Sequence, residues 1–359
     1  MSVSETRLMK GNEAIGEAAI VAGCRHYFGY PITPQTELME YMAKRMPQIG
    51  GVFLQAESEV AAINMVYGAS GAGARVMTSS SSPGISLKAE GISYCAGAEL
   101  PCVIVNIMRG GPGLGSIQPA QADYFQATKG GGHGDYRNIV LAPNSVQEMA
   151  DLTTLSFELA DKYRTPVILL GDGALGQMME PVNFEEKPAV MQEKPWAANG
   201  LKERIKPNVI NSLYLKPEQL EAHNFRLQDK YRTITEQERR WEEIKVEDAE
   251  LIIVAYGITS RIARSAVEMA RRDGLKVGLY RPISLWPFPS ERLQELAQST
   301  KAFLVSELSA GQMIEDVQLA TKQIRPVHFY GRMGGMMPNP REIYDQIRLI
   351  MEGREAAVK

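Results

Sequence analysis

The sequence has few cysteines, and this scarcity excludes several kinds of protein. Only three occur among 359 residues, Cys24, Cys95 and Cys102, and none forms a Cys-x-x-Cys pair. A disulfide framework is therefore excluded, and the low number fits a reducing compartment such as the cytoplasm. An iron–sulfur cluster usually needs four closely spaced thiolates, so we expect this chain to hold no cluster by itself.

A large excess of one charge and long apolar runs are also missing. The formal net charge is −3, which gives no electrostatic reason to expect nucleic acid or an anionic membrane as a partner. No apolar run reaches the about 18 residues of a membrane-spanning helix, and the N-terminal residues show no signal-peptide core. With 44% hydrophobic and 23% charged residues, we expect a globular, cytoplasmic protein.

Short apolar runs alternate with helix-like segments in the first half of the chain. Runs such as CVIVNIM (102–108) are apolar on both faces, which is typical of a parallel sheet covered by helices on both sides. Residues 8–180 are therefore predicted to form a doubly wound α/β domain. The predicted strands are 26–31, 51–56, 75–81, 102–108, 139–143 and 166–172, and the predicted helices are 36–45, 59–70, 85–97 and 145–163.

The second half of the chain divides into two parts. Residues 181–247 are rich in proline, lysine and glutamate, and we predict a long linker with some helix. Within it, the charged run 236–247 is predicted to be a solvated helix. Strands and helices alternate again from LIIVAYG (251–257), so residues 248–352 are predicted to form a smaller parallel-sheet α/β domain.

Four unusual segments follow strands of the first predicted domain, where open parallel sheets bind their ligands. They are YPITP (30–34), QAESE (55–59), TSSSSPG (78–84) and RGGPGLG (109–115). Two prolines fix the backbone around Thr33 and present one hydroxyl, and hydroxyls and amides before a helix can hold an anion or a polar ring edge. Each segment also has a simpler explanation, as a rigid turn, a helix cap or a solvated loop.

Glu59 and Arg109 are the charged candidates in these segments. Glu59 opens a helix of small and apolar residues, where a partly desolvated carboxylate would suit proton exchange near neutral pH. A glutamate in a first helical turn can also serve only the helix dipole. Arg109 could clamp a carboxylate through two parallel hydrogen bonds, and its glycines allow close approach of the backbone. Ser116 breaks the glycine fingerprint of dinucleotide sites, which excludes a nicotinamide enzyme.

The order of these segments, followed by QPAQAD (118–123), resembles the α subunit of thiamine-diphosphate-dependent 2-oxoacid:ferredoxin oxidoreductases. The resemblance spans nearly the whole chain, because YRPISLWPFP (280–289) is similar to a turn of transketolase C-terminal-like domains. The branched-chain, 2-oxoisovalerate type is the most similar, through the run that begins QAESEVAAINMVYG and through GGGHGDY. A pyrimidine-binding domain and a smaller transketolase C-terminal-like domain are therefore implied.

The resemblance also implies roles for particular residues. Glu59 matches the glutamate that hydrogen-bonds N1′ of the pyrimidine ring and promotes its imino form, with Glu57 as the competing candidate. Arg109 and Thr33 match the residues that contact the carboxylate of the substrate. The further positions implied to bind the cofactor are Pro31, Ser82 and Gly84.

A multi-subunit enzyme is the further implication. A partner β subunit would bind the diphosphate and Mg²⁺ and carry a [4Fe-4S] cluster, beside a γ subunit and a ferredoxin-like δ subunit. The complex would convert a 2-oxoacid and CoA to acyl-CoA and CO₂ and pass the electrons to ferredoxin. Three alternatives stay open: another substrate (2-oxoglutarate, pyruvate or an aryl-glyoxylate), half of a non-redox thiamine diphosphate decarboxylase, or a structural subunit with a degenerate site.

Two features resemble sites that we do not predict. Residues 171–173 (GDG), followed by Asn199, imitate a magnesium-diphosphate motif, but the residues that follow have the character of a linker. We therefore predict that 171–173 end the last strand and that the chain holds no metal. The second feature is His133, which lies in a glycine-rich loop, GGGHGD, and its role is left open.

Overall fold

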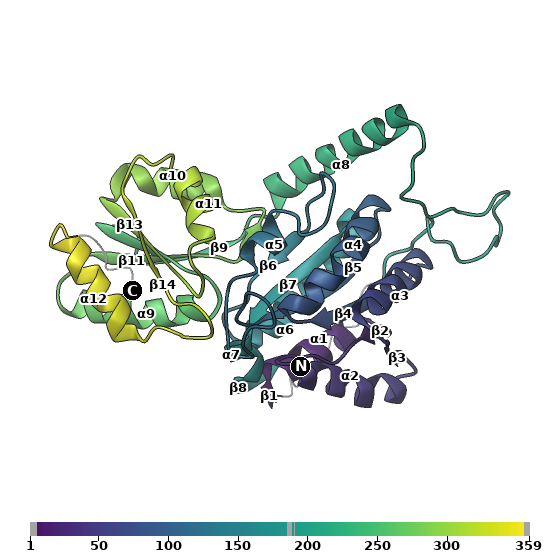
Figure 1. Cartoon of the computed structure of the whole chain (residues 1–359), viewed down its shortest axis with the longest axis horizontal. Coiled ribbons are helices and arrows are strands. Elements are labelled where there is room, and N and C mark those ends of the chain that lie inside the picture. Colours follow the sequence, from purple (N-terminus) through teal and green to yellow (C-terminus); the bar gives the residue numbers. More distant parts are fainter. Residues whose placement is uncertain (1–5, 185–188, 190, 355–359) are drawn as a thin grey trace, which may run out of the picture.

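The computed structural model describes residues 6–184, 189 and 191–354. Its larger sheet has seven strands, all parallel to their neighbours except β12, which is antiparallel to β6 (Figure 1). From one edge to the other they are β12 (Ser284–Trp286), β6 (Ile139–Leu141), β7 (Pro166–Asp172), β5 (Cys102–Met108), β4 (Val76–Ser80), β2 (His26–Gly29) and β3 (Val52–Gln55).

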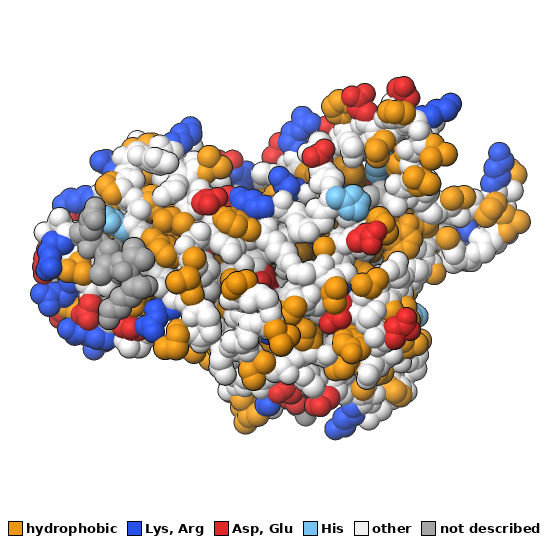
Figure 2. Space-filling view, viewed as in Figure 1, with side chains coloured by type: hydrophobic (Ala, Val, Ile, Leu, Met, Phe, Trp, Pro, Cys, Tyr) orange, Lys and Arg blue, Asp and Glu red, His pale blue; other side chains and the backbone are white. Residues whose placement is uncertain are grey.

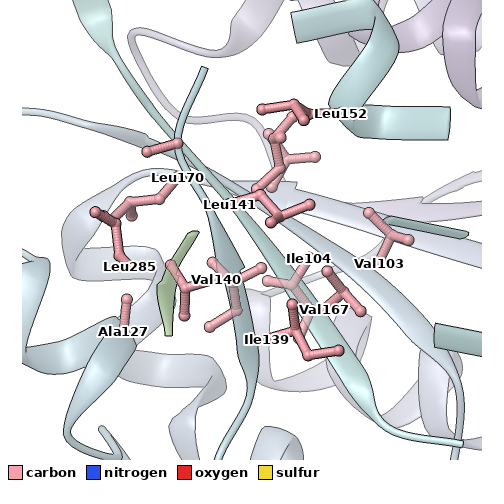
Figure 3. Packing of buried hydrophobic residues seen from close by; sticks show 14 of the residues in the cluster. Val103, Ile104, Ala127, Ile139, Val140, Leu141, Leu152, Val167, Leu170 and Leu285 are labelled. Atoms are coloured by element: carbon pink, nitrogen blue, oxygen red, sulfur yellow. The ribbon is translucent and has the colours of Figure 1, made fainter. Parts of the chain in front are cut away.

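Helices cover both faces of this sheet. Every residue of the central strands β4, β5 and β7 is therefore buried. Their apolar side chains interlock with those of β6 in the main hydrophobic core, as Val103, Ile104, Val140 and Val167 show (Figure 3). The helices are α1 (Gly11–Val21), α2 (Thr36–Gln48), α3 (Glu59–Gly71), α4 (Ser82–Gly97), α5 (Tyr124–Thr128), α6 (Val146–Tyr163) and α7 (Gly173–Gln177). The predicted doubly wound α/β class is confirmed.

A second sheet has five strands, in which only β9 is antiparallel to its neighbour β11. From edge to edge they are β14 (Val327–Gly331), β13 (Ala302–Glu307), β10 (Leu251–Val254), β11 (Val277–Pro282) and β9 (Trp241–Ile244). The helices of this part are α9 (Gly257–Arg272), α10 (Ser290–Ser299), α11 (Met313–Ala320) and α12 (Pro340–Met351). The α/β pattern predicted from residue 251 onward is therefore present.

The charged run 236–247 is not the solvated helix that the sequence predicts. Helix α8 (Pro217–Gln237) ends where the run begins, and Trp241–Ile244 form the edge strand β9. The glutamates of this strand pair with arginines: Glu242 lies 2.8 Å from Nε of Arg281, and Glu243 lies 2.8 Å from Nε of Arg292. The many charges of this run therefore form ion pairs along the edge of a sheet. The end of the predicted linker (181–247) belongs to the second sheet.

The two sheets are joined by residues 281–286. After β11 the chain crosses to the larger sheet, where β12 pairs with β6, and Leu285 packs close to Ala127 and Leu170 (Figure 3). The buried guanidinium of Arg281 also donates two hydrogen bonds of 2.7 Å to Glu148 on α6. The segment YRPISLWPFP (280–289) therefore does more than form a turn. It contains the end of β11 in the second sheet and the whole of β12 in the larger sheet.

Two elements near the N-terminus have no counterpart in the prediction. A two-stranded antiparallel sheet joins β1 (Thr6–Lys10) to β8 (Met179–Asn183), and α1 follows β1 directly. Between β8 and α8, residues 191–216 contain no helix or strand, and part of this segment forms a loop that projects from the body of the molecule (Figures 1 and 2). Ala197 of the same segment is buried, and Trp196 and Ile210 pack against the main core. In the described ranges, no helix has the length and apolar character needed to cross a membrane.

Candidate active site

The four segments singled out in the sequence leave the same edge of the larger sheet, because β2, β3, β4 and β5 are parallel. Glu59 is the first residue of α3, where the Ser58 hydroxyl caps the helix by accepting a hydrogen bond from the amide of Ala61. The side chain of Glu59 is buried, and its carboxylate makes no hydrogen bond with any described residue. Glu57 is exposed. Glu59 rather than Glu57 therefore offers a shielded carboxylate with free acceptor capacity.

Gly84, in the first turn of α4, makes room beside Glu59. A Cβ atom at this position would lie 2.0 Å from Oγ of Ser80 and 2.7 Å from Oε1 of Glu59, so a side chain cannot fit without moving both. The hydroxyls of Ser80 and Ser81 are buried without a hydrogen-bond partner in the described structure. A free carboxylate, two unpaired hydroxyls and a missing side chain fit the polar edge of a flat heterocycle such as an aminopyrimidine.

Ser82 lies in a hydrogen-bonded group that connects three loops; we call Ser82, Asn106 and Asp123 the Ser82 network. The hydroxyl of Ser82 donates to Asp123 (2.6 Å) and accepts from the amide of Arg109 (3.1 Å). Asn106 donates to Asp123 (2.9 Å) and accepts from the amide of Ser82 (3.2 Å). Burial raises the pKa of Asp123, and the two hydrogen bonds that it accepts oppose this shift.

Arg109 and Thr33 come together in the structure. The buried guanidinium of Arg109 donates to the backbone carbonyls of Thr33 (3.0 Å) and Leu114 (3.1 Å), while its Nε has no hydrogen-bond partner among the described residues. Thr33 and Pro31 are exposed at this edge. The arginine is thus held in one orientation by two loops and keeps N–H groups for an anionic ligand.

Two buried amides that the sequence analysis missed hold the turn around Thr33. Asn12 donates to the carbonyl of Pro34 (2.8 Å), and Gln35 donates to the carbonyl of Tyr30 (3.4 Å). Gln35 also accepts a hydrogen bond of 2.5 Å from the hydroxyl of Ser79. Gln35 directly follows the YPITP motif, which could have indicated it, whereas nothing in the local sequence indicates Asn12.

The most unusual residue that the sequence analysis missed is Lys88. Its side chain on α4 is completely buried, and its Nζ donates to Oγ1 of Thr78 (2.6 Å) and to the carbonyl of Ser79 (3.4 Å). Burial lowers the pKa of Lys88 to about 7, and the negative charge of Glu59 opposes this shift. A signal existed in the sequence, because Lys88 lies at helical spacing from Ile85 and Ile92 on the buried face of α4.

The GDG sequence has a structural use. Asp172 ends β7, and its carboxylate accepts hydrogen bonds from the amides of Ala174 and Leu175 (3.0 Å each) and of Ile258 (3.2 Å). Burial raises the pKa of Asp172 to about 6, against the effect of these bonds. The predicted end of the last strand is confirmed, and no group of three or more His, Cys, Asp or Glu residues suited to a metal occurs in the described ranges.

His133 lies in an exposed loop. Its carbonyl accepts a hydrogen bond of 2.7 Å from Ser93, and its ring lies edge-on to Tyr94 with the ring centroids 6.1 Å apart. These contacts anchor the loop to α4 and give the imidazole no catalytic partner.

Two models of known protein families match the chain. Residues 17–251 match the family described as "Pyruvate flavodoxin/ferredoxin oxidoreductase, thiamine diP-bdg". The chain belongs to this family. Residues 249–343 match a second family model, pyruvate:ferredoxin oxidoreductase core domain II.

Individual relatives are similar over nearly their whole length. The chain is 57% identical to ketoisovalerate oxidoreductase subunit VorB of Methanothermobacter marburgensis, over 96% of this chain and 98% of the relative. It is 36% identical to 2-oxoglutarate synthase subunit KorA of Methanocaldococcus jannaschii, over 94% of this chain and 98% of the relative. Both relatives are named as subunits, so both belong to larger enzymes.

Two solved structures are similar in fold. The first is 2-oxoglutarate:ferredoxin oxidoreductase from Magnetococcus marinus, with 2-oxoglutarate, coenzyme A and succinyl-CoA bound. It has a TM-score of 0.86 and 30% identity, over 96% of this chain and 65% of that longer chain. The other, a split-gene transketolase in an inactive β4 tetramer, has a TM-score of 0.56 and 17% identity, over 97% of this chain and 95% of that chain. It supports the fold alone.

A methyl group at Gly84 tests the pocket beside Glu59. Gly84→Ala is expected to displace Glu59 and Ser80 and to weaken binding of thiamine diphosphate to the assembled enzyme by about 10-fold or more, as overpacking of a tight site does. Gly68→Ala in α3 is the matched control, because nothing lies within 4 Å of the added atom. Isothermal titration calorimetry measures both, and equal affinities would contradict the assignment of the pocket.

The titration of Lys88 should make the free energy of unfolding of the chain depend on pH. The pKa of Lys88 is about 7 in the folded state and 10.5 by its ordinary value, so the unfolded chain holds more protons between these pH values. The free energy of unfolding contributed by Lys88 therefore rises with pH across this window. Lys88→Met lacks this titration. The free energy of unfolding of Lys88→Met minus that of the native chain is therefore expected to be highest at pH 7 and below, and to fall as the pH rises toward 10. Urea unfolding across this range measures the difference, which would be independent of pH if Lys88 were not perturbed.

Proposed function

We propose that this chain is the α subunit of a 2-oxoisovalerate:ferredoxin oxidoreductase and supplies one half of a shared thiamine diphosphate site. The observation that carries the proposal is the free, buried carboxylate of Glu59 beside Gly84, in a chain 57% identical to a ketoisovalerate oxidoreductase subunit. When bound, thiamine diphosphate supplies a nucleophilic carbon that decarboxylates a 2-oxoacid.

Glu59 would act on the pyrimidine ring of the cofactor. Its carboxylate has free acceptor capacity, and α3 fixes its backbone, so it can hold or release one proton at N1′ of the ring. Burial excludes most water from this exchange. Gly84 and the unpaired hydroxyls of Ser80 and Ser81 would shape the place where the polar edge of the ring lies.

Arg109 and Thr33 would hold the carboxylate of the substrate. The guanidinium is oriented by the carbonyls of Thr33 and Leu114, and its unused N–H groups can pair with a carboxylate. The exposed hydroxyl of Thr33 and the ring of Pro31 lie on the neighbouring turn. The 2-oxo group would then lie between the arginine and the cofactor, as the chemistry requires.

The remaining parts of the reaction would lie in other subunits. The three cysteines, Cys24, Cys95 and Cys102, are buried thiols and too few for an iron–sulfur cluster. Asp172, the acidic residue of the GDG sequence, is occupied by three backbone amides. We therefore assign the diphosphate, Mg²⁺ and a [4Fe-4S] cluster to a partner β subunit, beside a γ subunit and a ferredoxin-like δ subunit. Ferredoxin would be the electron acceptor and CoA the acyl acceptor.

A substrate panel tests the proposed function. The complex, purified with its native partners, is assayed for reduction of ferredoxin with CoA and, in turn, 2-oxoisovalerate, 2-oxoglutarate, pyruvate and an aryl-glyoxylate. The highest kcat/KM is expected for 2-oxoisovalerate. A preference for 2-oxoglutarate, which the 36% identity to KorA makes the second candidate, would overturn the substrate assignment and keep the family.

Substitution of the two candidate glutamates tests the catalytic assignment. Glu59→Gln in the assembled complex is expected to lower kcat by at least about 100-fold, because the amide cannot exchange a proton with the ring. Glu57→Gln is the matched control, since Glu57 is exposed and lies two residues earlier. Turnover close to that of the native complex in the Glu59 variant would refute the assignment.

Loss of Arg109 should affect binding of the substrate. Arg109→Ala removes a charge-assisted pair with the substrate carboxylate, so KM for the 2-oxoacid is expected to rise by roughly 10-fold or more. Steady-state kinetics at saturating CoA separates KM from kcat. The control is Arg264→Ala, which removes an exposed arginine from α9. An unaltered KM in the Arg109 variant would remove this residue from the site.

A further inference from the structure

We propose that two loops beside Arg109, one from each domain, form the surface on which the β subunit docks to complete the shared site. The exposed side chains of this surface are Leu114, Ile117, Met333, Met336 and Met337, and we call them the apolar rim. The inference rests on the proposed function, because that proposal assigns the diphosphate to a partner subunit. It gives the second domain a part in the assembly of the site.

The first loop follows Arg109 directly and is closed at its base. The amide of Gly110 donates a hydrogen bond of 3.0 Å to the carbonyl of Gln118. The guanidinium of Arg109 donates to the carbonyl of Leu114 (3.1 Å), so this loop borders the place proposed for the substrate carboxylate. The side chains of Leu114 and Ile117 are nevertheless 85% and 56% exposed. An apolar surface therefore adjoins the candidate active site.

The second loop, residues 332–338, follows β14 and lies in backbone contact with the first. A Cβ atom on Gly110 would lie 3.0 Å from the carbonyl carbon of Gly334, and one on Gly335 would lie 2.4 Å from Cβ of Gln118. Gly334 and Gly335 also have positive φ angles, 67° and 104°, which favour glycine. The glycines thus allow the two loops to touch, and the two parts of the apolar rim lie side by side.

Three methionines extend the apolar surface onto the second loop. Met333 and Met336 are each 56% exposed, and Met337 is 41% exposed. The charged residue of this loop, Arg332, pairs with Glu342 (2.7 Å). Large apolar side chains that gather on a surface mark interaction sites, and methionine is enriched where subunits meet. The apolar rim therefore fits a partner with an apolar surface rather than one of opposite charge.

The position of the apolar rim favours one partner. In the part of the chain that the structure describes, no group of three or more His, Cys, Asp or Glu residues suits a metal, and Asp172 is occupied by backbone amides. The β subunit of the proposed function brings the diphosphate, so it must come within one cofactor length of Glu59. It then covers the edge of the larger sheet that Arg109 and its loop border. A second copy of this chain would leave the site without ligands for the diphosphate.

Photo-crosslinking in the complex with its native partners tests which chain covers the apolar rim. Met336→p-benzoylphenylalanine places the probe on the second loop. The control is Leu319→p-benzoylphenylalanine near the end of α11, where the side chain is 77% exposed outside the apolar rim. Irradiation is expected to join the Met336 variant to the β subunit and to leave the Leu319 variant unlinked. A crosslink to another copy of this chain or to the γ or δ subunit, or no crosslink at all, would overturn the inference.

The strength of assembly is the second test. Met333→Glu combined with Met336→Glu would bury two unpaired charges in the interface, so Kd for the β subunit is expected to rise by about 100-fold or more. Mass photometry of the diluted complex measures this change. Leu319→Glu combined with Ile324→Glu is the matched control, because both residues are exposed and precede β14, whereas the second loop follows it. Native assembly of the methionine variant, or an equal loss in the control, would contradict the proposal.

The outcomes keep the two proposals apart. If the crosslink to the β subunit forms but the complex reduces ferredoxin with none of the 2-oxoacids, the proposed function fails and the docking surface is supported. If the complex turns over 2-oxoisovalerate but shows neither the crosslink nor the loss of assembly, the docking surface fails and the proposed function is supported.

Discussion

The hydrogen bond from the hydroxyl of Ser82 to the carboxylate of Asp123 joins segments that are 41 residues apart in the chain. Through the amide of Arg109 and the side chain of Asn106, the Ser82 network connects the ends of β4 and β5 to the loop that follows. Because its members are largely buried, an unpaired group would be costly, so the network has a single well-satisfied arrangement. That arrangement fixes the backbone of Arg109 and the start of α4, the helix that carries Gly84 and Lys88.

The second domain completes this arrangement through the loop at 118–123. The buried side chain of Gln121 donates to the carbonyl of Tyr256 (2.8 Å) and accepts from the amide of Leu308 (3.0 Å). Gln312 donates to the carbonyl of Ala122 (2.7 Å). These contacts come from the carboxyl ends of β10 and β13 and fix the loop that carries Asp123. The second sheet therefore stabilises the site without contributing one of its candidate catalytic residues.

The parts that the sequence predicted well are those with a local signal. Apolar runs such as CVIVNIM identify buried parallel strands, and the ends of these strands identify the edge where Glu59 and Arg109 lie. Pairings between distant segments have no such signal: β12 joins β6 across more than 140 residues, and β9 carries enough charge to suggest a helix. The Ser82 network was missed for the same reason, because its partners meet only after the sheet has formed.

Lys88 is a different case, since its helical spacing with Ile85 and Ile92 was visible in the sequence. Charged residues on an apolar face are usually assumed to reach solvent, and only the packing of α3 on α4 shows that this one does not. The sequence thus predicted at which edge of the sheet the candidate residues Glu59, Arg109 and Thr33 lie. The burial of Lys88 and Glu59 depends on how the two helices pack.

A structure of the assembled complex with thiamine diphosphate bound tests the central claim most directly. The account predicts the aminopyrimidine N1′ within hydrogen-bond distance of the carboxylate of Glu59, at about 3 Å, with the diphosphate held by a partner subunit. A cofactor whose diphosphate lies on this chain at residues 171–173, or whose pyrimidine ring has no contact with Glu59, would contradict it.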